Sequence, residues 1–236
     1  MSSLASVPTS ESRPARAERT RGQILEAAGR RFAAAGYAAT RLEDVGREVG
    51  IGRSAVLYHF KDKKLLYRAV LDDLFAELLE IERSALLAKG SLADRLDDAI
   101  CVFVDFMGRH PTAARLAMRE LISLDPEIRE EFQARMRPFL ALLEMIFEEG
   151  GRSGTFRSVR SDLYHFLSTI AGSTLFYVAA LPTLVGELPY DRLSSEQLDV
   201  HKRDLMEITR ALLGIRSPRP RRNRSSGKIG ENHDDS

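Results

Sequence analysis

The sequence predicts an all-α protein with a small N-terminal domain and a larger C-terminal domain. Tryptophan is absent and few segments are rich in Val, Ile or Thr, so strands are disfavoured. Apolar residues recur at helical spacing, as in Ile24, Ala28 and Phe32. Glycines and capping residues divide the chain into about nine helices. We expect three helices in the first domain and six in the second.

The composition limits the classes of protein to consider. The chain has 236 residues, of which 44% are apolar and 29% charged, as in globular proteins that bury a core without disulfides. The single cysteine, Cys101, excludes an internal disulfide and a multi-cysteine metal site, and it is expected to be buried. Residues 1–20 contain no apolar run typical of a signal peptide, so we expect a cytoplasmic protein.

The charges are distributed unevenly along the chain. Residues 13–65 hold 12 basic and 6 acidic side chains, a net charge of +6, whereas residues 66–213 hold 17 and 24, a net charge of −7. A basic block on an acidic body suggests an anionic partner for that block. A solvated helical surface is the alternative explanation of the same pattern.

The first two helices are marked by glycines and by a capping pattern. A helix begins near Ala17 and is expected to stop at Gly36, a residue that tolerates the left-handed conformation. Thr40 and Glu43 have the spacing of a capping box, in which the hydroxyl accepts from a free backbone N–H and the glutamate reaches back. A short second helix follows and ends at Gly50.

A third short helix carries Val56 and Phe60 on one face, and Asp62 then caps a fourth helix over residues 63–88. The segment 42–60 therefore reads as helix, glycine-containing turn and helix, which is a helix-turn-helix. Residues 21–66 resemble the DNA-binding domain of the TetR/AcrR family of transcriptional regulators. The matching residues are Ile24, Leu25, Ala27, Ala28, Phe32, Gly36, Tyr37, Thr40, Val45, Val49, Gly50, Ile51, Tyr58, His59, Phe60, Lys63, Leu65 and Leu66.

The rest of the chain is similar to that family in outline. Further helices are expected after Ser91, at Pro111, after Asp125 with a kink at Pro138 and an end at Gly150, over residues 162–181, and from Ser194 to Leu213. The resemblance implies that residues 16–62 bind DNA and that residues 63–213 bind an effector and dimerise. Residues 1–15 and 214–236 are expected to be disordered tails.

The exposed face of the third helix supplies the candidate base contacts. They are Arg53, Ser54, Leu57 and Tyr58, with Arg53 first because a guanidinium can bridge guanine O6 and N7. Many family members have tyrosine where Leu57 stands, and a leucine cannot donate to a phosphate. The candidate phosphate contacts are Thr40, Arg41, His59, Lys61 and Lys63. A capping role for Thr40 and a packing role for His59 remain open.

Aromatic and methionine side chains in the second domain suggest a mainly apolar effector pocket. The candidate lining residues are Phe103, Phe106, Met107, His110, Met118, Phe139, Leu143, Phe147, His165, Phe166 and Tyr177. For each of them, an ordinary place in the core is the alternative.

The last two helices are the candidate dimer interface, because two such pairs related by a two-fold axis would form a four-helix bundle. The candidate residues are Ile170, Gly172, Leu175, Phe176, Ala179, Leu198, Leu205, Ile208 and Leu212.

Several other sequence patterns give weaker evidence about function. The segment Gly50-x-Gly52-x-x-Ala55 spells a dinucleotide fingerprint, but a helix precedes it where that motif needs a strand. The histidines show no i, i+4 pairing, so we expect no metal and no cofactor. Residues 163–186 lack charge and are long enough to span a bilayer, yet their polar residues fit a helix buried in a subunit interface equally well.

The C-terminal tail is basic, and it either adds sequence-independent DNA affinity or has no function. Its basic residues are Arg216, Arg219, Arg221, Arg222, Arg224 and Lys228.

Taken together, these patterns predict a homodimeric repressor that a small, mainly apolar effector releases from a palindromic operator. The alternatives are a DNA-binding regulator without an effector and a helical interaction protein, and activation in place of repression stays open. An enzyme is not expected, since no catalytic signature is visible.

Overall fold

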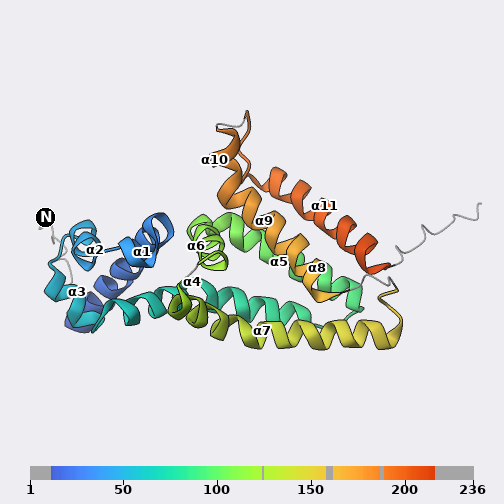
Figure 1. Ribbon diagram of the computed structural model, residues 1–236, viewed down its shortest axis with the longest axis horizontal. Coiled ribbons are helices and arrows are strands. Elements are labelled where there is room, and N and C mark those ends of the chain that lie inside the picture. Colours follow the sequence, from blue (N-terminus) through green and yellow to red (C-terminus); the bar gives the residue numbers. More distant parts are fainter. Residues whose placement is uncertain (1–11, 124, 158–161, 187–188, 216–236) are drawn as a thin grey trace, which may run out of the picture.

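The computed structural model describes residues 12–123, 125–157, 162–186 and 189–215. Throughout that part of the chain the secondary structure is helical, without a strand, as predicted (Figure 1). The expected tails lie mostly outside these residues. Residues 13–15 are an exception, because they form the first turn of a helix.

The N-terminal domain consists of α1 (Arg13–Ala39), α2 (Leu42–Val49) and α3 (Arg53–His59). Gly36 interrupts α1 with φ 83°, so the chain bends there and continues for one more short turn. This bend makes the predicted capping box wrong. The Thr40 hydroxyl donates to the carbonyl of Gly36 at 2.8 Å, and α2 begins after Arg41 without a side-chain cap.

The turn between α2 and α3 depends on a glycine inside α2. A Cβ at Gly46 would lie 2.6 Å from the backbone oxygen of Ile51. The Ile51 N–H also donates to the Gly46 carbonyl at 2.8 Å, so both polar backbone groups of Ile51 lie close to Gly46. Val45 and Val56 are fully buried on either side of this turn. The close approach sets the angle at which α3 leaves the domain.

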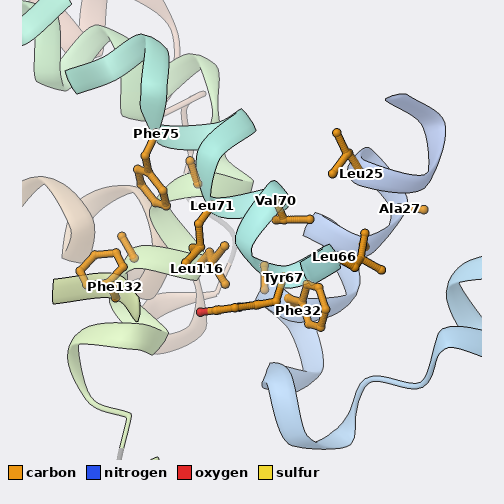
Figure 2. Packing of buried hydrophobic residues seen from close by; sticks show 14 of the residues in the cluster. Leu25, Ala27, Phe32, Leu66, Tyr67, Val70, Leu71, Phe75, Leu116 and Phe132 are labelled. Atoms are coloured by element: carbon orange, nitrogen blue, oxygen red, sulfur yellow. The ribbon is translucent and has the colours of Figure 1, made fainter. Parts of the chain in front are cut away.

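The core of the first domain continues without a break into the second. Phe32 of α1 packs edge-on against Tyr67 of α4 (Lys63–Leu86), with ring centroids 5.1 Å apart. Figure 2 shows these two residues beside Leu66, while Phe75 and Phe132 extend the same cluster into the body. α4 therefore belongs to both domains.

The body is built from long helices that begin at the predicted caps. Asp62 accepts from the backbone of Leu65 at the start of α4, and Ser91 and Asp125 cap α5 (Leu92–Arg109) and α7 (Pro126–Ser153) in the same way. α6 (Pro111–Leu121) begins at its proline. Cys101, expected to be buried, is half-buried on α5.

The end of α7 differs from the prediction. The helix runs through Pro138 and past Gly150 to Ser153, and it ends at Gly154, which adopts a left-handed conformation. Gly150 has another role, since Phe156 folds back over it with ring atoms about 2.1 Å from where a Cβ would stand.

The last part of the body is a helical run followed by α11 (Ser195–Leu213), which Ser194 caps. The run is α8 (Leu163–Leu167), η1 (Ser168–Gly172), α9 (Ser173–Leu175), η2 (Phe176–Ala180) and α10 (Leu181–Val185), where η1 and η2 are π-helical. By length and composition alone this run is apolar enough to cross a membrane. It packs against α5, α6 and α11 of the same body (Figure 1).

Candidate nucleic-acid interface and ligand cavity

Most of the predicted DNA contacts surround one shallow depression at the end of the first domain. It is lined by Thr40, Arg41, Leu42, Glu43, Arg53, Leu57, Lys61, Asp62 and Lys63. Four basic and two acidic side chains give this surface a net charge of +2. The structure thus brings together residues from three helices that the sequence separates by more than twenty positions.

Arg53 has the position expected of a base reader. It begins α3, its side chain is 60% exposed, and its Nε lies 3.3 Å from a carboxylate oxygen of Glu43. An exposed pair of this kind stabilises little, so the guanidinium can exchange this partner for a base edge. Ser54 is exposed next to it, and Tyr58 is 84% exposed on the same helix.

Leu57 and Thr40 face inward more than predicted. Leu57 is half-buried and packs against the domain core, so only part of it reaches the surface. Thr40 is 4% exposed, and its hydroxyl proton is already engaged with Gly36. In this conformation the hydroxyl proton is not free for a phosphate, so a DNA contact by the Thr40 side chain stays a prediction that requires the hydroxyl to rotate.

Lys63 and His59 are also less exposed than expected. The Lys63 ammonium donates to the carbonyl of Ala38 at 3.1 Å and lies 4.5 Å above the ring of Tyr37. Burial lowers the pKa of Lys63. Two of its N–H donors remain for a phosphate. His59 is half-buried and meets the ring of Tyr58 edge-on at 5.4 Å.

The C-terminal body contains a large apolar cavity. Its volume is about 460 Å³, within the usual range for small-molecule sites. Its wall is formed by α4, α5, α6, α7 and the helical run α8–η1–α9. The lining residues are Phe75, Leu78, Leu79, Glu82, Phe103, Met107, Ala117, Leu121, Phe132, Gln133, Met136, Phe139, Leu140, Leu167, Ser168, Ala171, Gly172 and Leu175.

Five of the eleven predicted pocket residues line this cavity or a smaller one of about 60 Å³ beside it. Phe103 and Phe139 line both, Met107 lines the larger cavity, and Leu143 and Phe166 line the smaller one. The predicted set thus overlaps the cavity walls at these five residues, and their contact with an effector stays a prediction.

The other six predicted residues line neither cavity: Phe106, His110, Met118, Phe147, His165 and Tyr177. Phe106 packs against His110 with the ring planes tilted by 30° and the centroids 4.4 Å apart, and Tyr177 stacks on His201 at 4.6 Å. His165 is exposed and pairs with Asp162 at the start of α8.

The sequence reasoning missed Glu82, the one charged side chain on the described walls of both cavities. It is 4% exposed, and burial raises its pKa to about 8. A signal was present in the sequence. Leu78, Glu82 and Leu86 are spaced four apart, so a carboxyl stands in the middle of the apolar stripe of α4.

A second missed feature is the wide helical turn at η1. Ser168, Ala171 and Gly172 of this π-helical stretch line the larger cavity. Such turns occur often at functional sites, because the extra residue widens the helix locally.

The predicted interface residues divide into two groups. Ile170, Leu175, Leu198 and Leu205 are at most 6% exposed within a single chain, so they do not form a free surface. Leu198, for example, approaches Gly108 of α5, where a Cβ would lie 2.6 Å from its side chain.

The remaining interface residues are available for contact. Gly172, Phe176 and Ile208 are exposed, and Ala179 and Leu212 are half-buried. Tyr164, Leu184 and Val200 add further exposed apolar side chains on the same two helical runs.

α6 connects the cavity to the first domain. Ala117 and Leu121 line the cavity, and Arg119 between them points the other way. Its guanidinium donates to the carbonyls of Ala33 at 3.3 Å and Ala34 at 2.8 Å, near the end of α1. A Cβ at Gly36 would lie 3.1 Å from the same guanidinium.

Comparison with known proteins places both domains in one family. Residues 24–70 match the model of the bacterial regulatory proteins of the tetR family, and residues 89–174 match that of the tetracyclin repressor-like C-terminal domain. Together these matches cover more than half of the chain.

Solved structures share the fold. A TetR-family regulatory protein from Rhodococcus RHA1 is 22% identical, with a TM-score of 0.67, and the match covers 84% of this chain and 99% of that one. The fatty acid degradation regulator FadR from Bacillus halodurans is 17% identical, with coverages of 83% and 95% and a TM-score of 0.64. FadR from Bacillus subtilis, solved with stearoyl-CoA, is 18% identical, with coverages of 83% and 99% and a TM-score of 0.64. With a helix-turn-helix domain and a cavity-bearing body both matched, the chain belongs to the TetR/AcrR family of DNA-binding transcriptional regulators.

Proposed function

We propose that this protein is a cytoplasmic, homodimeric repressor that a small, mainly apolar effector releases from a palindromic operator. It has no catalytic role in this proposal. Each protomer places α3 in the major groove, so that Arg53 contacts a base edge and Lys61 and Lys63 contact phosphates. Ser54 and Tyr58 are the other side chains on the exposed face of α3 that reach the DNA.

The observation that carries the proposal is the double contact of α6. One face of this helix lines the 460 Å³ cavity and the other holds the end of α1 through Arg119. A ligand that moves Ala117 or Leu121 therefore also moves the carbonyls of Ala33 and Ala34. α4 gives a second route, since it lines the cavity at Phe75 and begins beside the basic surface.

Release follows if the ligand favours a conformation in which the two DNA-binding domains no longer match the half-site spacing. The likeness to FadR of Bacillus subtilis, which was solved with stearoyl-CoA, supports a ligand in this body. The exposed apolar residues Phe176, Leu184 and Ile208 support a dimer interface along α8–α10 and α11.

The test begins with capture of bound genomic DNA, which gives the operator. Affinity for that operator is then measured by fluorescence anisotropy, with and without candidate apolar ligands, for wild type and Arg119→Ala. We expect the variant to bind the operator and to lose most of the ligand effect. Arg115→Ala, an exposed arginine on the same helix, is the control and should respond as wild type does. Absence of a preferred DNA sequence would contradict the proposal.

A further inference from the structure

Glu82 stands apart from every other residue of the cavity wall. The other described lining residues of the two cavities are uncharged, and nearly all are apolar. Glu82 lies on the wall that the two cavities share, together with Phe103, Phe139, Leu167 and Ala171. No hydrogen bond or ion pair joins its carboxyl to another described residue, although the residue is only 4% exposed.

A buried carboxyl without a partner costs free energy, unless something binds it. The side chains that form ion pairs with carboxylates elsewhere in this protein are those of Arg, Lys and His, and none of them lies on the described wall. The polar residues there, besides Glu82, are Gln133 and Ser168. Both are exposed, and so is Leu121, which places the solvent side of the cavity near α6, α7 and η1. Glu82 is thus the polar group of the buried side.

We propose that the effector is an apolar molecule with one cationic amine, and that the amine binds the Glu82 carboxylate. This inference rests on the proposed effector function and adds the chemical class of the effector. Along α4 the wall runs from Phe75 to Glu82, seven residues or about 10 Å. A ligand of that length places its apolar part against Phe75, Phe103 and Phe139 and its amine at the carboxyl.

The same geometry disfavours an anionic head group at this position. A carboxylate or phosphate beside Glu82 would meet a like charge when Glu82 is ionised. When Glu82 is protonated, the anion would still lie in an apolar cavity without a cation to balance its charge. The proposed effector, an apolar molecule with a cationic amine, therefore differs in charge from an acyl-CoA whose anionic part enters the cavity.

Binding of the amine carries a proton balance that can be measured. Because burial raises the pKa of Glu82 to about 8, the free protein holds the carboxyl protonated at pH 7. The ligand arrives as an ammonium ion, the Glu82 proton leaves to the buffer, and the ammonium then pairs with the carboxylate. Close to one proton per site is released at pH 7, and none at a pH well above the pKa of Glu82.

The test uses the full chain with decylamine, 1-decanol and decanoic acid, which share one alkyl chain and differ in the head group. Calorimetry in two buffers of different ionisation enthalpy gives both the affinity and the protons released. We expect wild type to bind decylamine about tenfold or more tightly than decanoic acid, with release of a proton. Glu82→Gln should lose that preference and the proton release, with decanol affinity within about twofold of wild type.

Glu77→Gln is the matched control, since Glu77 is exposed on the same helix and lines neither cavity. Thermal unfolding of each variant verifies that it is folded. Decanoic acid binding as tightly as decylamine, undetectable decylamine binding, or a Glu82→Gln variant that keeps the amine preference would each overturn the inference.

Measuring operator binding in the presence of the same ligands separates this inference from the proposed function. Decylamine that binds with proton release but leaves the operator bound would retain the amine site and contradict effector control. Decanoic acid that releases the operator where decylamine does not would support effector control and contradict the amine site.

Discussion

The buried carboxyl of Glu82 should make the free energy of unfolding depend on pH, and Glu82→Gln should remove this contribution. Glutamate has an ordinary pKa of 4.5, which applies in the unfolded chain, whereas burial raises the pKa of Glu82 to about 8 in the folded protein. Between these two values the unfolded state has lost the proton and the folded state keeps it. Raising the pH therefore favours unfolding, so the contribution is fully present below about pH 4.5 and is lost by about pH 8.

The size of this effect follows from the difference between the two pKa values. Each pKa unit corresponds to about 1.4 kcal/mol, so deprotonation of folded Glu82 costs roughly 3–5 kcal/mol. The lower part of that range applies when water enters the cavity past Gln133 and Ser168. Against a typical domain stability of about 5–15 kcal/mol, this is a large share.

Urea unfolding followed by far-ultraviolet circular dichroism measures the effect at a fixed protein concentration. The quantity of interest is the free energy of unfolding of wild type minus that of Glu82→Gln, because other titrating groups cancel in it. It should fall by about 1.4 kcal/mol per pH unit from about pH 5 to pH 8 and then level off. Glu77→Gln, measured in the same way, is the control for removing a carboxyl from an exposed position on the same helix. A flat difference between wild type and Glu82→Gln would refute the assignment of a buried, unpaired carboxyl.

Three further predictions concern the DNA-binding domain and the dimer. Arg53→Ala should cost about 1–3 kcal/mol of operator affinity and relax base preference at one position per half-site. Lys63→Ala should instead weaken binding to all sequences alike, and it should lower the slope of log affinity against log salt concentration by about one per lost phosphate contact. Anisotropy on operator variants at several salt concentrations distinguishes the two, and a reversed pattern would contradict the placement of α3. Gly46→Ala should destabilise the protein by about 1–3 kcal/mol in urea unfolding, since the added Cβ would stand 2.6 Å from a carbonyl oxygen of the next turn. Ile208→Glu should lower the sedimentation mass to that of a monomer, with Met145→Glu, at an exposed position on α7, as the control that stays dimeric.

The sequence predicted helix starts well, because capping depends on neighbouring residues. Asp62 and Ser91 accept the predicted backbone N–H groups at the starts of α4 and α5. Thr40 has the same local pattern and fails, because the bend at Gly36 leaves a carbonyl within reach of its hydroxyl. The Thr40 hydroxyl could bond either the Gly36 carbonyl or the first backbone N–H groups of α2. The backbone conformation of Gly36, four positions away, decides between them, and the spacing of Thr40 and Glu43 gives no information about it.

The site was predictable to the level of helix faces. Phe103 and Met107, one turn apart, both line the cavity, whereas Phe106 lies on another face and packs in the core. Which face of α5 meets the cavity depends on how α4, α6 and η1 surround it, and single-chain periodicity does not give that arrangement. The basic surface was easier to find, since Arg53 begins the short helix α3 and Lys63 begins the next helix, so that they lie only ten residues apart in the sequence.

In the proposed mechanism, the contact of Arg119 with the carbonyls of Ala33 and Ala34 would also act in the opposite direction. A helix that transmits ligand binding to the DNA-binding domain transmits DNA binding back to the cavity. Thermodynamic reciprocity then requires the operator to lower ligand affinity by the same factor by which the ligand lowers operator affinity. Under the proposed mechanism, a protomer on its operator would respond to its ligand at a higher concentration than a free protomer, so operator occupancy would set part of the threshold for release.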